Sequence, residues 1–183
     1  MKEHSENRRV RMTKRLIKDA LLDLLERTDL SGISVTALCA AADVNRSTFY
    51  AYYASPSDLL REIEQDVLDR IPAPPYPQNR HWEESLLPIT TAYFDYVKEN
   101  EKVFRVLFSK AANADFSSRM VDLLCSQLIV GIENEDELSA RFLQLYIANG
   151  TVGMLREWVD AGFPISSREI AKKMYSYSRK ITE

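Results

Sequence analysis

The side chains best suited to chemistry lie in one short stretch, Arg46-Ser-Thr-Phe-Tyr-Ala-Tyr-Tyr53. On a helix, Phe49 and Tyr53 are four residues apart and share an apolar face. The opposite face carries one cation and small or hydroxyl-bearing side chains: Arg46, Ser47, Tyr50 and Ala51. Arg46 can address a guanine edge or a phosphate, and Ala51 can contact a thymine methyl group. The stretch is typical of a helix that enters the major groove of DNA, although a three-helix core with a polar outer face shows the same pattern.

Cationic side chains precede this stretch. Residues 1–18 hold seven Lys or Arg against two Glu, a net charge of +5, whereas the rest of the chain carries −8. Lys14 and Arg15 fall in the expected first turn of a helix, where partial positive charge normally favours Asp or Glu. A DNA backbone alongside would offset this repulsion, because phosphate contacts contribute much of the affinity for DNA. The basic N-terminal arm indicates an anionic partner, nucleic acid or a membrane surface, with a solubilising tail as the alternative.

Short helices are expected to position these residues. The first stops at Ser31-Gly32 and buries an apolar stripe at helical spacing: Ile17, Ala20, Leu21, Leu24 and Leu25. Ser34 is the expected N-cap of the second, whose inward residues are Val35, Leu38, Cys39 and Ala42. Asp43-Val44-Asn45 ends the second helix, and Asn45 caps a third that runs from Arg46 to about Tyr53. Ser55-Pro56 opens a fourth that runs to Arg70. Two helices joined by a three-residue turn and braced by another form a helix-turn-helix.

A proline-rich segment divides the chain. Four of the seven prolines lie between residues 71 and 77, and proline interrupts both helices and central strands. We therefore predict a DNA-binding domain over 1–71, with the basic arm and the fourth helix, a hinge over 72–82 and a second domain over 83–183. The expected helices after the prolines are 82–100, 101–109, 116–130, 137–161 and 167–181, the last with a Ser166-x-x-Glu169 capping box. No alternating strand pattern occurs, so the predicted fold class is all-α.

Other function classes find little support. The two histidines, His4 and His81, form no catalytic or metal-binding motif. Cys39 and Cys125 have neither metal-ligand spacing nor a disulfide framework. The sequence has no glycine-rich phosphate loop, no apolar stretch that would span a bilayer, and a polar, basic start in place of a signal peptide. We expect a cytoplasmic protein that is not an enzyme and that uses no metal or cofactor.

A known family is similar to this sequence over about residues 10–60. These residues resemble the DNA-binding domain of tetracycline-repressor-type (TetR family) regulators, most distinctively in the block Val44-Asn-Arg-Ser-Thr-Phe-Tyr-x-Tyr-Tyr53. The resemblance implies a dimer whose recognition helices enter successive major grooves of a palindromic operator. It also implies that Thr36 and Tyr52 contact phosphate, and that other side chains lie near the bases: Arg46, Thr48, Tyr50 and Ala51. The predicted DNA-binding set also includes Lys14, Arg15 and Ser47.

Three positions depart from the family pattern. Asp43 replaces the usual turn glycine, but it tolerates the left-handed conformation better than most residues, so the turn should survive. Ala51 stands where a histidine is common, which removes one polar contact. Pro56 replaces the usual lysine at the start of the fourth helix and cannot supply its phosphate contact. Affinity is therefore expected to depend more on the N-terminal arm.

The second domain contains a candidate dimer interface. Residues 146–162 and 167–171 look like the end of one group of TetR C-terminal domains. The expected helix 137–161 has two apolar faces, one with Leu138, Phe142, Leu145, Val152, Leu155 and Val159, the other with Leu143, Ile147, Gly150, Met154 and Trp158. Such a helix is either central in its own bundle or shared with a partner subunit. With the final helix, the predicted interface residues are Leu145, Gly150, Gly153, Met154, Met174 and Tyr177.

Aromatic residues cluster in the same domain. They could line an apolar ligand pocket, although aromatic residues at helical spacing more often belong to the core. The predicted pocket residues are Tyr93, Tyr96, Phe104, Phe108, Phe142, Tyr146 and Trp158.

These patterns together predict a sequence-specific DNA-binding transcription regulator, a dimeric, ligand-responsive repressor of a palindromic operator. Its expected partners are double-stranded DNA, a second copy of itself and a small apolar or aromatic effector, without a membrane. The alternative is a helical coactivator or adaptor that works through protein contacts, which Ala51 and Pro56 favour.

Overall fold

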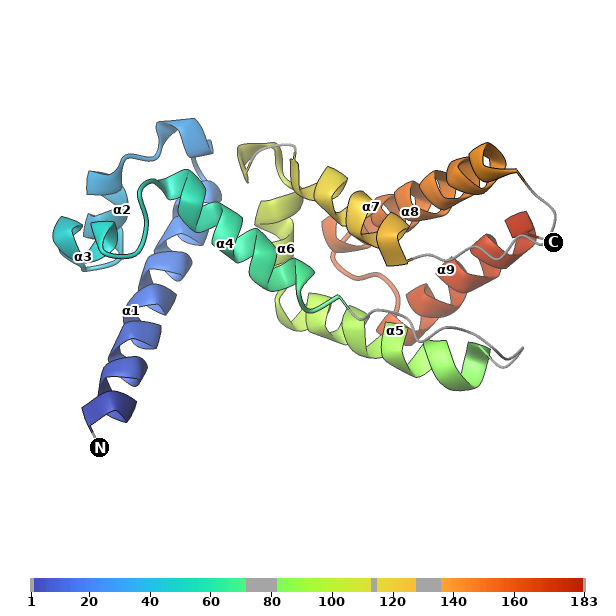
Figure 1. The fold of residues 1–183 in the computed structure, drawn as a ribbon, viewed down its shortest axis with the longest axis horizontal. Coiled ribbons are helices and arrows are strands. Elements are labelled where there is room, and N and C mark those ends of the chain that lie inside the picture. The colour runs from blue at the N-terminus through green and yellow to red at the C-terminus, as the bar shows by residue number, and fades with distance from the viewer. Residues whose placement is uncertain (1, 72–81, 113–114, 128–135, 183) are drawn as a thin grey trace. The chain divides into compact units, whose positions relative to one another are not determined.

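The computed structural model describes residues 2–71, 82–112, 115–127 and 136–182. In those ranges all regular elements are helices, which confirms the all-α prediction (Figure 1). The chain divides into two compact units. Unit 1 comprises Met1–Val67 and Ser109–Ala114, and unit 2 comprises Leu68–Phe108 and Asp115–Glu183. The predicted hinge over 72–82, with His81, lies outside the described residues except for Trp82, where a helix begins.

Unit 1 holds the predicted helix-turn-helix. Its elements are α1 (Lys2–Leu25), a 3₁₀ turn (Leu30–Gly32), α2 (Val35–Ala41), α3 (Arg46–Tyr50), α4 (Pro56–Leu68, whose last residue falls in unit 2) and a second 3₁₀ turn (Lys110–Ala112). α2 packs against both α1 and α3. The predicted apolar stripes meet in the core, where the fully buried side chains include Ile17, Leu21, Leu38, Phe49 and Leu59.

Local side-chain chemistry sets the ends of these helices. The Ser34 hydroxyl accepts a hydrogen bond from the Ala37 amide at 3.1 Å, and the Ser55 hydroxyl accepts one from the Asp58 amide at 3.2 Å. Both predicted caps are thereby confirmed. Asn45 occupies the N-cap position of α3, but its side chain makes no capping hydrogen bond. Asp43 has a φ of 51°, the left-handed conformation expected of it in the turn.

The beginning of α1 differs from the prediction. The helix begins at Lys2, so Lys14 and Arg15 lie in its interior and not in its first turn. Residues 2–13 contain neither proline nor glycine, and nothing in them stops a helix that extends backwards from the buried stripe. The repulsion between a helix N-terminus and these two cations, which the sequence suggested, is therefore absent.

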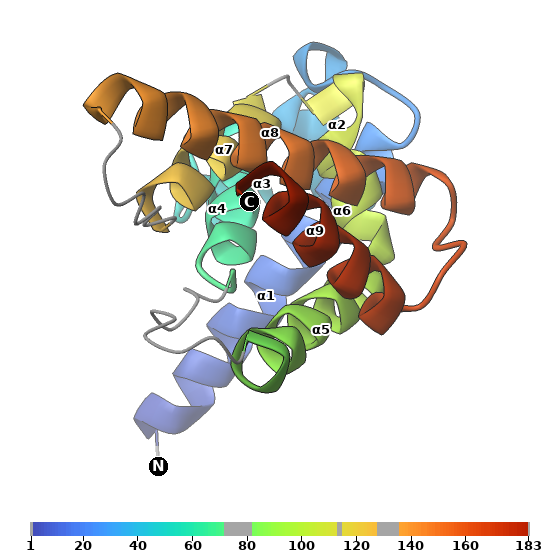
Figure 2. The same cartoon turned by 90° about the vertical axis from the view of Figure 1, so that its right-hand side faces the viewer.

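Unit 2 is a bundle of helices as well. Its members are α5 (Trp82–Glu99), α6 (Glu101–Phe108), α7 (Asp115–Gln127), α8 (Glu137–Asp160) and α9 (Ser167–Thr182). α5 packs chiefly against α9, and α7 against α8 (Figure 2). The predicted capping box begins α9: the Ser166 amide donates to the Glu169 carboxylate at 2.9 Å, and the Glu169 amide donates back to the Ser166 hydroxyl at 3.3 Å.

Candidate functional site

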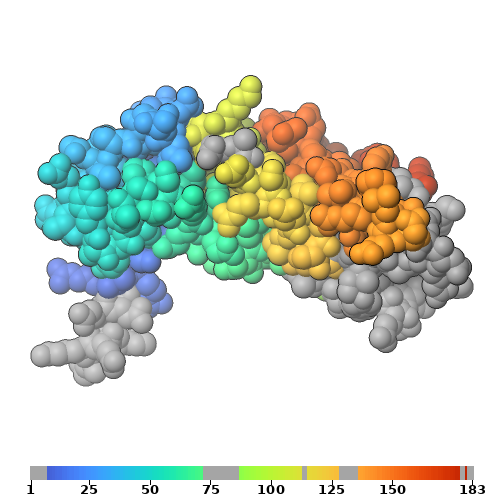
Figure 3. Space-filling model, turned by 45° about the horizontal axis from the view of Figure 1, so that its top comes forward, coloured from blue at the N-terminus to red at the C-terminus, as the bar shows by residue number. Residues whose placement is uncertain are grey.

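The outward side of α3 carries the residues predicted to read DNA. Phe49 and Tyr53 are buried with their ring centroids 5.7 Å apart, and they fix α3 on the core. The opposite side is exposed: Arg46, Ser47, Tyr50 and Ala51. Figure 3 shows α2, α3 and the start of α4 as one continuous surface, coloured blue to cyan. The short helix α3 thus presents a largely polar face that the core does not use.

Two of the predicted contact residues lie together at one edge of this face. The Arg46 guanidinium donates a hydrogen bond from Nη1 to the Thr36 hydroxyl at 3.3 Å, which joins α3 to α2. Both side chains are exposed, and Thr48, two residues after Arg46, is half-buried. A guanidinium paired with a hydroxyl retains donors for a base edge or a phosphate, because Arg carries five N–H groups.

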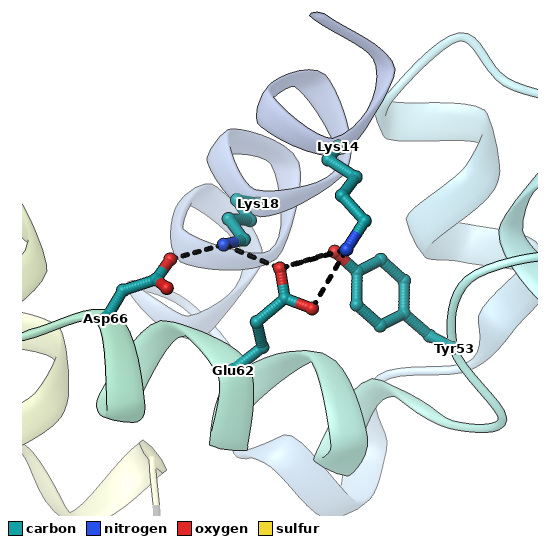
Figure 4. A network of polar contacts seen from close by, with 5 residues as sticks. All are labelled: Lys14, Lys18, Tyr53, Glu62 and Asp66. Carbon is teal, nitrogen blue, oxygen red and sulfur yellow. Dashed lines mark hydrogen bonds and ion pairs between the residues drawn. The ribbon is translucent and has the colours of Figure 1, made fainter. Parts of the chain in front are cut away.

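Lys14 lies in a network of polar contacts between α1 and α4 (Figure 4). Its ammonium is 3.2 Å from Glu62 Oε2, and the Lys18 ammonium is 2.8 Å from Glu62 Oε1. Lys18 also pairs with Asp66, and the Tyr53 hydroxyl donates to Glu62 Oε1 at 3.1 Å. We call these five residues the α1–α4 network. One carboxylate, that of Glu62, therefore receives three donors.

The contacts within this network favour the charged forms of Glu62 and Lys18. Partial burial disfavours the Glu62 carboxylate, but hydrogen bonds from Lys18 and Lys14 outweigh it and hold the pKa of Glu62 below its usual range. Burial also disfavours the charged form of Lys18, yet its bonds to Asp66 and Glu62 raise its pKa. Burial and the nearby Glu62 charge raise the pKa of Tyr53, so its hydroxyl stays a donor.

Other cations of α1 are much less constrained. Arg15, a predicted DNA-binding residue, is 78 % exposed and lies 3.7 Å from Asp19, whereas Lys14 is 34 % exposed. Arg8 and Arg9 are exposed as well. Lys14 also lies beside the predicted phosphate contact Tyr52, with its ammonium 5.7 Å from the ring centroid. The basic arm thus separates into exposed arginines and a lysine pair held by α4.

Sequence reasoning missed Glu62 and Asp66. A signal was present, since Lys14 and Lys18 are four residues apart on α1 and the two acids are four residues apart on α4. Matching i, i+4 pairs of opposite charge favour two helices that lie side by side.

The predicted pocket residues do not form one group. Tyr93, Tyr96, Phe104 and Phe108 follow one another in ring contacts, with Tyr96 and Phe104 centroids 5.9 Å apart and Phe104 and Phe108 centroids 6.2 Å apart. Trp158 is buried against Phe94 and donates from Nε1 to the Ile165 carbonyl at 2.9 Å. The remaining two, Phe142 and Tyr146, lie elsewhere, each 62 % exposed on α8.

These exposed aromatics belong to a groove of about 660 Å³ on α8 and α9. Its lining contains five of the six predicted interface residues, namely Leu145, Gly150, Met154, Met174 and Tyr177, and also Phe142, Tyr146, Ile147, Asn149 and Thr151. An added Cβ at Gly150 or Gly153 would meet nothing within 4 Å. The outer side of α8 is therefore an open, largely apolar surface.

The assignment of residues to the two faces of α8 needs correction. Leu138 and Phe142, predicted to share a face with Val152, Leu155 and Val159, are exposed, while those three are buried. At 3.6 residues per turn, positions 142 and 152 lie about 80° apart, so a long straight helix does not keep them on one face. Trp158, predicted opposite, joins the buried side.

The described residues offer neither a metal site nor a membrane span. They contain no group of three or more His, Cys, Asp or Glu arranged to hold a metal ion. None of their helices combines the length and the apolar character needed to cross a membrane.

Comparison with known proteins agrees with this architecture. A TetR-family model described as "Transcriptional regulator C-terminal region" matches residues 84–180. The uncharacterized HTH-type transcriptional regulator YxbF of Bacillus subtilis is 30 % identical over 117 residues, which is 61 % of this chain. The matched part is only 27 % of the length of that relative.

Solved structures show the same fold. A TetR transcriptional regulator from Streptococcus agalactiae superposes with a TM-score of 0.66 at 21 % identity, covering 99 % of each chain. The dihydroxyacetone kinase operon activator DhaS gives 0.62 at 19 % identity over 93 % of this chain and 96 % of its own. NalD of Pseudomonas aeruginosa, a secondary repressor of a multidrug efflux pump, gives 0.63 at 13 % identity over 93 % and 96 %. With a family match over more than half of its length, the chain belongs to the TetR family of transcriptional regulators.

Proposed function

We propose that unit 1 binds double-stranded DNA and that α3 enters the major groove. The observation that carries this proposal is the exposed polar side of α3, bounded by the Arg46–Thr36 hydrogen bond. Arg46, Ser47, Thr48, Tyr50 and Ala51 would lie near the bases, and Thr36, Tyr52, Lys14 and Arg15 would contact phosphates. The exposed arginines of α1 supply further positive charge for the backbone.

We also propose that a second copy of the chain covers the groove on α8 and α9. Phe142, Tyr146 and Tyr177 are large apolar side chains exposed on that surface, and such patches mark interaction sites. Glycine in a helix interior costs about 0.8–1.0 kcal/mol relative to alanine. Gly150 and Gly153 meet no crowding within their own chain, so close approach of a partner helix is the use that their small size supports. A twofold dimer would read a palindromic operator.

We propose regulation by a small apolar or aromatic effector in unit 2. Besides the ring contacts, three buried polar atoms among the described residues have no hydrogen-bond partner: Thr91 Oγ1, Tyr93 Oη and Gln127 Oε1. Buried polar atoms normally find partners, and Tyr93 belongs to the ring contacts, so its hydroxyl supports an effector that carries a polar group on an apolar body. Repression is the simpler outcome, because an operator-bound dimer blocks DNA without a further contact surface.

A band-shift assay tests the DNA-binding proposal. The full chain is titrated onto duplex DNA from upstream of its own gene, with an unrelated duplex of equal length as competitor. We expect a specific complex that resists the competitor, and light scattering should give twice the 21.1 kDa chain mass. Absence of any specific complex would refute DNA reading by α3 and would leave the adaptor alternative, which the comparisons do not favour.

A further inference from the structure

We propose that Glu62 acts as an internal substitute for a DNA phosphate, binding Lys14 in the free protein and competing with the operator backbone for it. This inference rests on the proposed DNA binding by unit 1. Its starting point is the contrast within α1 between Arg15, whose side chain is 78 % exposed, and Lys14, whose side chain is 34 % exposed and held by Glu62 of another helix.

Lys14 lies beside one anion of its own chain, Glu62, and beside a tyrosine that is proposed to contact a second anion, the DNA phosphate. On one side its ammonium contacts both oxygens of Glu62, at 3.2 and 3.4 Å. On the other it lies within 5.7 Å of the ring centroid of Tyr52, the residue proposed to contact phosphate. At 34 % exposed, the Lys14 side chain remains accessible to an incoming phosphate. A carboxylate and a phosphodiester both offer oxygens and one negative charge, so they compete for the same ammonium.

Glu62 is better placed for this competition than Asp66. Asp66 pairs with Lys18, whose side chain is 21 % exposed, whereas Glu62 contacts both lysines and Tyr53. Tyr53 and Lys18 fix the position of the Glu62 carboxylate, because they bond to Oε1 whether or not Lys14 stays. Lys14 can therefore move to a phosphate while the rest of the α1–α4 network persists.

This arrangement has a measurable consequence for DNA affinity. A lysine that is neutralised by its own protein releases fewer counterions when DNA binds, and its phosphate contact requires the loss of an ion pair. Glu62 should therefore lower affinity for all duplexes alike, and should flatten the dependence of affinity on salt. Base preference, which resides on α3, should not change.

The test compares three variants of the full chain on an unrelated duplex and on operator DNA over a range of salt. Glu62→Gln keeps the shape but removes the charge, Asp66→Asn makes the same charge change one turn away, and Glu62→Gln/Lys14→Gln removes the freed lysine. Glu62→Gln should bind both duplexes roughly two- to fivefold more tightly, as a partly exposed ion pair suggests. Its slope of log affinity against log salt should steepen by about one unit.

Each outcome decides the matter. Asp66→Asn should change the DNA affinity and the salt slope less than Glu62→Gln does. The double variant should lose the gain in affinity that Glu62→Gln shows. Equal gains for the two single variants, a gain that survives in the double variant, or weaker binding at an unchanged slope would each overturn the role of Glu62. If Glu62→Gln melts below the assay temperature, Glu62→Asp replaces it: this variant withdraws the carboxylate by one methylene and should give a smaller gain in the same direction. A parent protein that binds no duplex at all would instead refute the proposed function, and this inference with it.

Discussion

The outward side of α3 and the outward side of α8 are both open surfaces, but they differ in what exposure means for a lone chain. On α3 the exposed groups are mixed: the Arg46 guanidinium and the Ser47 hydroxyl, which water solvates well, lie beside the Ala51 methyl and the ring of Tyr50, which is 58 % exposed. On α8 they are the rings of Phe142 and Tyr146, which water solvates poorly. A face with charged and polar groups can stay exposed to water until a transient partner binds, whereas an apolar face is better covered permanently. We therefore expect DNA to bind α3 reversibly and a second subunit to stay bound to α8.

The largest effect should come from a charge on the apolar surface. Gly150→Glu places a carboxylate where we expect two subunits to meet, and an unpaired charge in a dry interface costs several kcal/mol. Because a Cβ added at position 150 meets nothing within 4 Å in its own chain and the position is exposed, the monomer should still fold. We expect light scattering to show a monomer, circular dichroism to stay helical, and operator binding to disappear.

A matched control separates interface loss from a general effect of charge. Lys172→Glu introduces the same side chain on α9, at an exposed position outside the groove lining. It should leave the dimer intact. If Gly150→Glu remains dimeric, α8 is not the shared surface.

On the polar surface a single truncation should have a moderate effect. Arg46→Ala removes the cation of α3 and its bond to Thr36, and we expect operator affinity to fall by about 1–3 kcal/mol with relaxed preference at one base step in each half-site. Arg27→Ala, which removes an exposed cation in the turn after α1, is the control and should bind normally. Competition band shifts with single-base operator variants measure both the affinity and the base preference. If Arg46→Ala keeps the base preference of the parent, Arg46 does not contact a base.

A smaller and non-selective effect is expected from the exposed arginines of α1. Replacing Arg8, Arg9 and Arg11 by Gln retains the helix but removes three charges. Affinity should fall for operator and unrelated DNA alike, and the salt slope should flatten by up to about one unit for each phosphate that the variant no longer neutralises. Fluorescence anisotropy at several salt concentrations gives the slope. An unchanged slope would identify this part of the chain as a solubilising extension.

The smallest effect concerns stability and pH. Since the folded pKa of Glu62 lies below its ordinary value of 4.5, its ionised form stabilises the fold above about that pH, and the stabilisation disappears as the pH falls through the lowered value. The free energy of unfolding of Glu62→Gln at pH 7 should therefore be lower than that of the parent, by no more than about 1 kcal/mol for these partly exposed pairs. The two should converge once the pH falls below the lowered pKa of Glu62. Glu26→Gln, an exposed acid just after α1, should match the parent at both pH values.

Much of the fold could be predicted because its signals are local. Apolar residues at helical spacing located the helices, and the caps at Ser34, Ser55 and Ser166 depend on residues three positions apart. The start of α1 could not be predicted, because residues 2–13 carry neither an apolar stripe nor a capping signal. Contacts between residues far apart in the sequence were harder to predict.

The candidate sites illustrate that limit. The exposed side of α3 follows from four-residue spacing, so it could be inferred directly from the sequence. The partners of Lys14 could not, because Glu62 is 48 positions away and only the packing of α1 on α4 brings them together. The predicted faces of α8 are wrong for another reason, because they group positions 142 and 152, which a regular helix places about 80° apart, and the neighbouring helices decide which side is buried.

The two glycines of α8 should also make amide exchange in that helix sensitive to whether a second subunit is bound. Glycine is a poor helix former, so in an isolated chain the turn from Gly150 to Gly153 should open more often than the rest of α8. Backbone amides there should exchange with deuterium quickly when the chain is dilute. As the concentration rises and a second copy covers them, exchange of the same amides should become slow. The exchange rate at these residues would then measure dimer formation directly.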